Sequence, residues 1–139
     1  MKRNASAIWK GDLKSGTGSL TTDSQTLNQT PYSFKARFES GGGTNPEELL
    51  AAAHAGCFTM ATSAELGKAG FTPEVLETSC AITLDTSTLT ITKSELVMRA
   101  RVPGATKEQV ESAANGAKNG CPVSKLYKAE TTLTLHVEE

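Results

Sequence analysis

The sequence is poor in aromatic residues and has neither an excess of one charge nor a long apolar run. Aromatic residues make up 5% of the chain, which is too few for a surface that stacks nucleic-acid bases. Lys and Arg number 14 against 15 Asp and Glu, so the chain lacks the positive charge of a dedicated nucleic-acid-binding protein. No segment approaches the roughly 20 apolar residues of a membrane helix. We therefore expect neither nucleic acid nor a membrane as a partner.

Cysteine is also scarce, since only Cys57, Cys80 and Cys121 are present. An odd and small number does not fit a disulfide-stapled scaffold. A chain of 139 residues buries enough surface to fold without such bridges, so we expect a single domain over residues 1–139. The apolar stretch Ala5–Trp9 is too short for a secretion signal, which favours the cytoplasm. In that reducing compartment a pair of working cysteines is more often catalytic or metal-binding than structural.

The first 40 residues predict a β-meander. Strands are expected at Ala5–Lys10 and Ser19–Thr22, and a turn with proline at 28–31. After the turn, aromatic and polar residues alternate from Tyr32 to Glu39, which predicts a third strand with Arg37 on the face opposite the aromatic rings.

A long helix is predicted from Pro46 to about Lys68. Asn45 is a suitable N-cap, Glu48 can complete a capping box, and Gly70 can end the helix. We expect its apolar face to be buried in a core shared by two chains, because many of its residues are small. That face consists of Leu49, Leu50, Ala53, Cys57, Met60, Ala61 and Ala64.

The second half of the chain predicts two further strands, two helices and a last strand. The strands are expected at 78–85 and 89–102, and a capping box of Thr106 and Gln109 begins a helix that breaks at 119–122. A short helix follows from Pro122 to about Ala129, and residues 131–137 close the chain as a strand. The predicted class is therefore α+β.

Two cysteines have unusual backbone settings. Cys57 follows Gly56 in mid-helix, where glycine permits a kink or a close backbone approach, and free N–H groups at a restarted helix would favour a thiolate. Cys121 precedes Pro122 at the start of a helix. Cys80 fits a buried apolar thiol, and by its position alone Cys57 also fits a plain core residue.

A metal site is a second interpretation of the same region. His54 and Cys57 are three residues apart on a helix and could bind a metal with Cys121 or His136. No C-x-x-C or H-x-x-x-H pair supports such a site. We therefore expect His54 at an interface or on the surface, and no cofactor.

Seven short motifs occur in one consistent order along nearly the whole chain. Together they resemble the OsmC/Ohr family of organic hydroperoxide reductases, and in particular its osmotically inducible OsmC branch. The motifs are Trp9–Asp12, Leu27–Gln29 with Pro31–Tyr32, Arg37–Glu39, Gly43–Leu49, Ala52–Phe58, Ala69–Pro73, and Gly120–Ser124 with Lys128–Glu130.

The resemblance implies an OsmC-like fold and a role for four residues. Cys57 matches the peroxidatic cysteine and Cys121 the resolving cysteine, which forms a disulfide with it. Arg37 matches the arginine that holds thiolate and peroxide, and Glu47 the carboxylate that orients that arginine. The resemblance also implies an intertwined homodimer with sites at its interface. A thiol reductant restores the enzyme, and in relatives this can be a lipoyl-bearing protein.

The residues alone leave the assembly of this site open. Glu47 is free to pair with Arg37 if Glu48 serves the helix cap. Ten residues separate Glu47 from Cys57, which is about 15 Å along a straight helix. Arg37 could span part of that gap, the helix could bend at Gly56, or a second chain could supply one group. We favour a bend together with an interface site.

The neighbourhood of Cys57 predicts an organic substrate. Ala53, Phe58 and Met60 flank the thiol along the helix, and the meander offers further aromatic rings. An apolar pocket gains about 0.8 kcal/mol for each methylene that it buries, so alkyl or aryl hydroperoxides should be preferred to hydrogen peroxide. The alternative is a non-catalytic ligand-binding or redox-sensing protein of the same fold.

Overall fold

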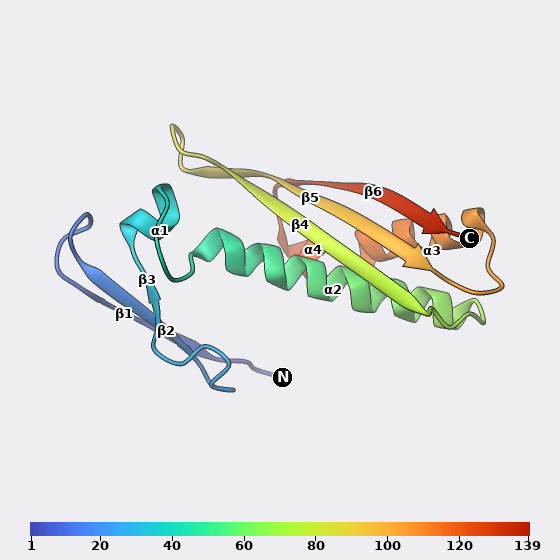
Figure 1. Cartoon of the computed structure of the whole chain (residues 1–139), viewed down its shortest axis with the longest axis horizontal. Coiled ribbons are helices and arrows are strands. Elements are labelled where there is room, and N and C mark those ends of the chain that lie inside the picture. The colour runs from blue at the N-terminus through green and yellow to red at the C-terminus, as the bar shows by residue number, and fades with distance from the viewer. The chain divides into compact units, whose positions relative to one another are not determined.

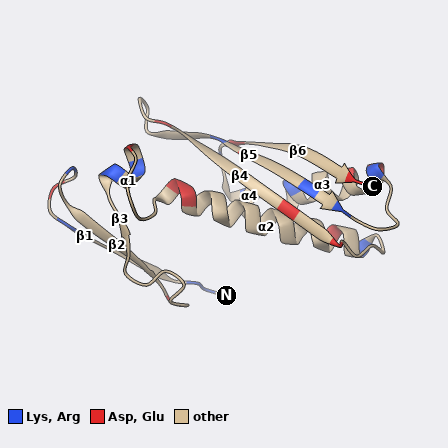
Figure 2. Ribbon diagram, in the orientation of Figure 1, with Lys and Arg blue, Asp and Glu red and all other residues tan.

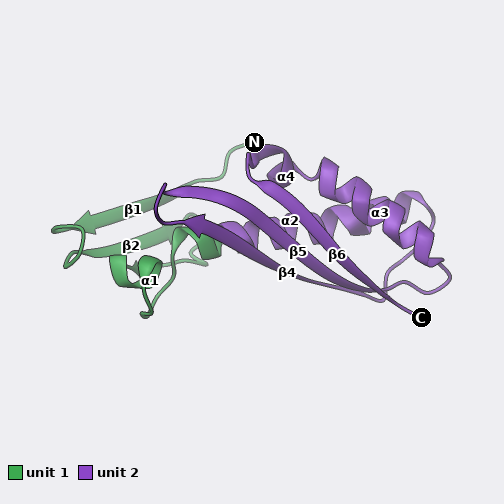
Figure 3. Cartoon of the chain, turned by 90° about the horizontal axis from the view of Figure 1, so that it is seen from above, with its two compact units in different colours: residues 1–49 green, residues 50–139 purple.

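The computed structural model describes the whole chain, Met1–Glu139, as two compact units. Unit 1 comprises Met1–Leu49 and unit 2 comprises Leu50–Glu139 (Figure 3). Each unit holds one three-stranded sheet, so the predicted α+β class is confirmed. None of the helices combines the length and the apolar character that crossing a bilayer requires.

Unit 1 contains the predicted meander. Strands β1 (Ala5–Lys10), β2 (Thr17–Thr22) and β3 (Thr30–Tyr32) form an antiparallel sheet in that order. Gly18 lies opposite both Trp9 and Tyr32 in the register. A side chain at Gly18 would come within 2.5 Å of the Tyr32 ring and 2.6 Å of the Trp9 ring. Glycine therefore lets the two aromatic rings close over the sheet.

The predicted strand over residues 32–39 is wrong beyond Tyr32. Helix α1 (Phe34–Phe38) occupies most of this segment, and the Ser33 hydroxyl caps it by accepting the N–H of Ala36 at 3.1 Å. Phe34 and Phe38 fit a helix because residues four apart share one face, and their ring centroids are 4.8 Å apart. Alternation over so few residues is compatible with either structure.

Helix α2 (Pro46–Lys68) begins and ends where the sequence predicts. The Asn45 side chain accepts the N–H of Glu48 at 2.8 Å, and Gly70 adopts a φ of +89° beyond the last turn. The expected capping box is not formed, because the Glu48 carboxylate accepts the Thr44 hydroxyl at 3.0 Å instead.

The sheet of unit 2 combines a hairpin with a parallel crossover (Figure 1). Strand β4 (Val75–Asp85) pairs antiparallel with β5 (Thr90–Arg101), and β6 (Glu130–Glu138) pairs parallel with β5. A parallel pair needs a connection that returns along the sheet. Two helices provide it, α3 (Lys107–Gly120), with the predicted capping box at its start, and α4 (Pro122–Leu126), which is shorter than predicted.

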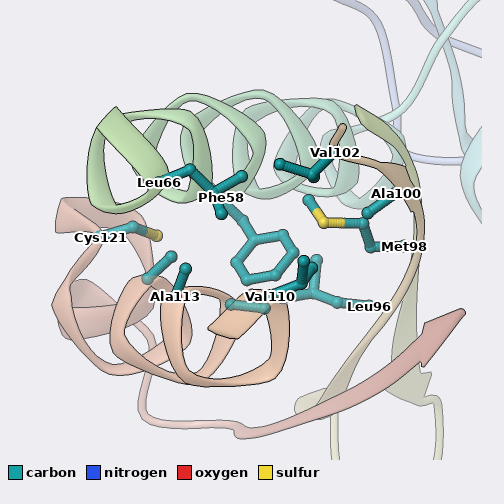
Figure 4. Packing of buried hydrophobic residues seen from close by; sticks show 11 residues of the cluster. Phe58, Leu66, Leu96, Met98, Ala100, Val102, Val110, Ala113 and Cys121 are labelled. Atoms are coloured by element: carbon teal, nitrogen blue, oxygen red, sulfur yellow. The ribbon is translucent and has the colours of Figure 1, made fainter. Parts of the chain in front are cut away.

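The core of unit 2 is built around Phe58 on α2 (Figure 4). Four residues at intervals of four, His54, Phe58, Thr62 and Leu66, are fully buried along one face of α2. The predicted apolar face is therefore only partly right. Three residues of that predicted face, Ala53, Met60 and Ala64, are exposed to solvent in the single chain. The other buried core members come from β5, from α3, and from Val102 and Cys121, which directly follow these elements: Leu96, Met98, Ala100, Val102, Val110, Ala113, Ala114, Ala117 and Cys121.

Removing side-chain volume from this core should cost stability. We expect Leu66→Ala to lower the free energy of unfolding by about 2–5 kcal/mol, because the side chain is fully buried and leaves a cavity. The matched control is Leu89→Ala, since Leu89 is 70% exposed and should change the free energy by less than about 0.5 kcal/mol. Chemical denaturation measures both, and equal losses would contradict this description of the core.

Candidate thiol site

Cys57 and Cys121 come together in unit 2. Cys57 lies on α2, which continues through Gly56 without a break, and Cys121 is the N-cap of α4. The backbone N–H of Val123 and the thiol of Cys121 both lie close enough to the Cys57 sulfur to shift its pKa. The helix does not restart at Cys57, and a side chain at Gly56 would meet only open space in the chain. The N–H group that lowers the pKa of Cys57 belongs to Val123 of α4.

Cys121 is held more tightly than Cys57. Its side chain is 1% exposed, and its sulfur accepts the N–H of Ser124 at 3.3 Å. The hydroxyl of Ser124 also contacts the sulfur at 3.1 Å. Further along the chain the Tyr127 hydroxyl donates to the Leu50 carbonyl at 2.8 Å. Hydrogen bonds thus hold the segment from Cys121 to Tyr127 in place, both within the segment and to Leu50 of α2.

The surroundings of Cys57 in unit 2 favour the neutral thiol. Burial raises the pKa of Cys57, the N–H of Val123 lowers it, and the neighbouring Cys121 raises it further. No Lys, Arg, Asp or Glu occurs between Glu48 and Glu65 on α2 (Figure 2). A thiolate at Cys57 therefore requires a cation that this stretch of α2 does not provide.

Arg37 and Glu47 form an ion pair in unit 1. The Nε and Nη2 atoms of Arg37 donate to one oxygen of Glu47, Oε1, at 3.1 and 2.8 Å. The other oxygen, Oε2, is buried and has no hydrogen-bond partner. The Arg37 side chain is 40% exposed, and with five N–H donors it can still bind a further anion. Of the four predicted site residues, Arg37 pairs with Glu47 in unit 1 and Cys57 with Cys121 in unit 2.

A hollow of about 250 Å³ lies beside Arg37 within unit 1. Its walls are mainly aromatic, and the guanidinium carbon of Arg37 lies 5.4 Å from the ring centre of Phe38. The lining residues are Trp9, Leu13, Tyr32, Ser33, Phe34, Arg37 and Phe38. Tyr32, Phe34 and Phe38, the aromatic residues expected near Cys57, line this hollow beside Arg37. Phe58 was expected to line the substrate pocket as well but fills the core instead.

His54 lies inside unit 2, contrary to the sequence-based prediction. It is fully buried, whereas an interface or surface position was expected. Both ring nitrogens contact hydroxyl groups: Nδ1 lies 2.6 Å from Ser94 Oγ, and Nε2 lies 2.7 Å from Ser124 Oγ. The sequence signal that indicates this burial is the recurrence of His54, Phe58, Thr62 and Leu66 at every fourth position of the helix. Burial lowers the pKa of His54, so the ring is neutral near neutral pH.

Cys80 contacts the same Ser94 hydroxyl as His54. It is partly buried, and its sulfur contacts the hydroxyl of Ser94 at 3.2 Å. Burial raises the pKa of Cys80, while the hydrogen bond with Ser94 lowers it. No three His, Cys, Asp or Glu side chains are arranged to hold a metal ion.

Comparison with known proteins decides the family. The model of the family described as OsmC-like protein matches residues 39–136. The chain belongs to the OsmC-like family. Peroxiredoxin OsmC of Escherichia coli is 47% identical over 133 residues, covering 94% of this chain and 93% of the relative. At this similarity over nearly both full lengths, the OsmC-like chain is a peroxidase that works through cysteine thiols.

Solved structures of OsmC-like proteins share the fold. An OsmC-like protein from Mycoplasma pneumoniae matches with a TM-score of 0.79 at 12% identity, covering all of this chain and 99% of the other. The organic hydroperoxide resistance protein OhrB of Bacillus subtilis matches with a TM-score of 0.62 at 23% identity, covering 97% and 98%. The OsmC-like fold therefore tolerates wide sequence divergence.

The buried neutral histidine should make stability depend on pH. In the unfolded chain His54 takes up a proton as the pH falls below about 6.5, whereas the folded protein resists protonation until its lowered pKa is reached. The free energy of unfolding should therefore fall between these two pKa values, with a slope of up to about 1.4 kcal/mol per pH unit. Urea denaturation between pH 7 and 5 measures this.

The contribution of His54 can be isolated by comparing two variants. His54→Gln should remove this part of the pH dependence, whereas His136→Gln should keep it because His136 is exposed. An unchanged slope in His54→Gln would contradict the assignment.

Proposed function

We propose that this peroxidase reduces organic hydroperoxides to alcohols through a sulfenic acid at Cys57 and a disulfide between Cys57 and Cys121. The thiolate of Cys57 attacks the peroxide, the O–O bond breaks, and the alkoxide leaves as an alcohol after it takes a proton. Cys121 then attacks the sulfenic acid, which forms the disulfide and releases water. The observation that carries the proposal is the closeness of the two thiols: Cys57 packs against the core cluster that contains Cys121, and Cys121 shifts the pKa of Cys57.

Arg37 is the proposed source of positive charge, and Glu47 positions it. An ordinary free thiol is only about 3% ionised at neutral pH. A nearby guanidinium lowers a thiol pKa by ~1–3 units, which gains at most about 30-fold in rate, or ~2 kcal/mol. Since that is modest for a peroxidase, Arg37 must also stabilise the charge that develops on the leaving oxygen. The N–H groups not bonded to Glu47 suit this role.

The proposed substrate carries an apolar group. The hollow next to Arg37 is walled by aromatic rings and is large enough for a small alkyl or aryl tail. OhrB of Bacillus subtilis, which shares the fold, is an organic hydroperoxide resistance protein, and this agrees with such a substrate. Burying the tail would contribute about 0.8 kcal/mol for each methylene, a gain that hydrogen peroxide lacks.

We further propose that two copies of the chain form an intertwined homodimer, with the whole chain acting as one OsmC-like domain. The uncovered face of α2 supports this, because Ala53, Gly56, Met60 and Ala64 are exposed in a single chain. Glu47 and Cys57 are ten residues apart on an unbroken helix, so in this arrangement Arg37 and Glu47 of one copy serve Cys57 of the other.

A thiol reductant completes the proposed cycle. It attacks the disulfide, forms a mixed disulfide and leaves both cysteines reduced. A dithiol such as a lipoyl group on a carrier protein is our preferred reductant, because its second thiol completes the exchange within one molecule. We place the cycle in the cytoplasm, where a reducing environment keeps the thiols available.

The two cysteines should fail in different ways when replaced. Cys57→Ser should abolish consumption of cumene hydroperoxide with dithiothreitol, because the proposed peroxidatic thiol is gone. Cys121→Ser should still react once, but its sulfenic acid should oxidise further and add oxygens to the intact mass instead of losing two hydrogens. Cys80→Ser is the control and should keep both the disulfide and turnover. Activity that survives in Cys57→Ser would remove the basis of the proposal.

Mixing two inactive variants tests the shared site. Arg37→Met and Cys57→Ser should each be inactive as pure proteins. After the subunits are mixed by reversible unfolding, about a quarter of the wild-type activity should return, because half of the dimers then contain one intact site. A mixture of Arg37→Met with Glu47→Gln is the control, since no site in it has both residues intact. Failure of the first mixture to recover would contradict a site shared between chains.

A further inference from the structure

His54, Ser94 and Ser124 form a buried hydrogen-bonded row that reaches Cys121. Ser124 Oγ lies 3.1 Å from Cys121 Sγ and 2.7 Å from His54 Nε2. On the other side of the ring, Nδ1 lies 2.6 Å from Ser94 Oγ. The residues come from α4, α2 and β5, so tertiary packing creates the row. Nothing in the disulfide cycle as described so far uses it.

We propose that this row is a proton relay in which Ser124 passes the thiol proton of Cys121 to Nε2 of His54 as Cys121 attacks the sulfenic acid. The relay consists of Ser124 and His54, with Ser94 holding the ring. This inference rests on the proposed roles of Cys57 and Cys121. It makes His54 and Ser124 positioning and proton-transfer residues of the resolving step, and gives them no part in the first reaction with peroxide.

The step balances in atoms and charge. The sulfur of Cys121 bonds to the sulfur of Cys57, and the S–O bond of the sulfenic acid breaks with its electron pair on the departing hydroxide. Ser124 Oγ takes the thiol proton and gives its own proton to His54 Nε2. The proton held by His54 then neutralises the hydroxide to water, so no proton is gained or lost overall.

Because Cys121 is buried, its thiol needs a proton acceptor inside the protein. Cys121 is 1% exposed, so bulk water has little access to its proton. Attack by a thiol requires that the proton leaves, because the thiolate is the nucleophile. A hydroxyl group can accept one proton while it donates another, which suits it as the bridge.

One set of donor and acceptor roles gives each polar group of His54, Ser94 and Ser124 a hydrogen-bond partner. The neutral ring carries its proton on Nδ1 and donates it to Ser94 Oγ, and the hydroxyl of Ser94 can donate onward to Cys80 Sγ. Nε2 is then free to accept from Ser124 Oγ. Cys80 lies beyond the relay and only receives the last bond.

No charged or titratable neighbour competes with His54 for the role of proton acceptor. The ring of Tyr127 meets it edge-on at 4.9 Å, and burial raises the pKa of Tyr127, whose hydroxyl already donates to Leu50. Beside Ser94 on β5 stand Lys93 and Glu95, which alternate to the other face of the sheet. Lys125 beside Ser124 and Lys128 near Tyr127 are exposed. None of the four charged side chains has a hydrogen bond to the ring.

The relay should show itself in the pH dependence of disulfide formation. With a base in place the rate is flat wherever His54 is neutral, and burial extends that range to lower pH by lowering its pKa. Without the base only thiolate already present can react, so the rate should fall about tenfold for each pH unit on the acid side. A side chain with a purely structural role would not change the shape of this profile.

The experiment follows one turnover in the absence of reductant. The reduced enzyme is mixed with one equivalent of cumene hydroperoxide at about pH 6 and at about pH 8, below and above the usual pKa range of histidine. Samples taken at intervals are quenched with dimedone, which labels the sulfenic acid, and their intact mass is measured by mass spectrometry. In Ser124→Ala and His54→Gln the sulfenic acid should persist at least about tenfold longer at the lower pH. Formation of the sulfenic acid should stay within about twofold of wild type.

Matched variants separate a relay from a loss of packing. Ser124→Thr keeps a hydroxyl and should restore both the rate and its flat pH profile. Ser112→Ala and His136→Gln change the same residue types at exposed positions and should behave as wild type. Should His54→Gln fail to fold, Ser124→Ala and its threonine rescue carry the test.

Two results would overturn the relay. One is a Ser124→Ala enzyme with the wild-type rate and pH profile of disulfide formation. The other is an equal loss in both chemical steps, which indicates a structural role only. Failure of the proposed cysteine pairing is distinguishable, because Cys121→Ser would then still form a disulfide at Cys57, which peptide mapping detects.

Discussion

The proposed chemistry of this protein depends on the close approach of Cys57 on α2 to Cys121 at the start of α4. That approach is maintained by two hydrogen bonds between short segments far apart in sequence, one between Ser124 and His54 and one from Tyr127 to Leu50. The parallel pairing of β5 and β6 sets where the second segment lies, because α3 and α4 form the connection between those strands. The scaffold of unit 2 therefore serves to present one short segment to one helix.

Two needs of the cycle conflict, and different parts of the chain meet them. Burial protects the thiols, but it also raises the pKa of Cys57 and so suppresses the thiolate that must react with peroxide. In the proposed cycle Arg37 supplies the missing charge, and the buried carboxylate of Glu47 holds its guanidinium. In the proposed second reaction the nucleophile is Cys121, whose proton leaves along hydrogen bonds through uncharged groups. On this proposal charge assists one sulfur and a neutral base assists the other.

Sequence patterns predicted most elements well, because their local signals were strong. The cap at Asn45, the glycine at 70 and the capping box at Thr106 fixed the two long helices, and regular alternation fixed β4, β5 and β6. The segment 34–38 was mistaken for a strand because its two phenylalanines satisfy both periods. The buried face of α2 was also mistaken in part. An alanine-rich helix offers small apolar residues nearly all round, so periodicity cannot show which side meets the sheet.

The candidate site was predictable as a set of residues but not as an arrangement. Motif resemblance singled out Cys57, Cys121, Arg37 and Glu47, and the contact between the two thiols depends on how β6 returns beside β5, which local patterns do not encode. His54 was undervalued for the same reason. Its two serine partners are 40 and 70 residues away, so only the folded chain brings them to the ring.

The continuity of α2 also limits how this sequence can vary in length. His54 and Cys57 are three residues apart and meet partners from α4, while Phe58 fills the core. One residue inserted between His54 and Cys57 would turn everything beyond it by about 100°, since a helix has 3.6 residues per turn. The thiol would leave Val123, and Phe58 would leave the core in the same step. A single-residue insertion or deletion in this stretch of the helix therefore disrupts the thiol site and the core together.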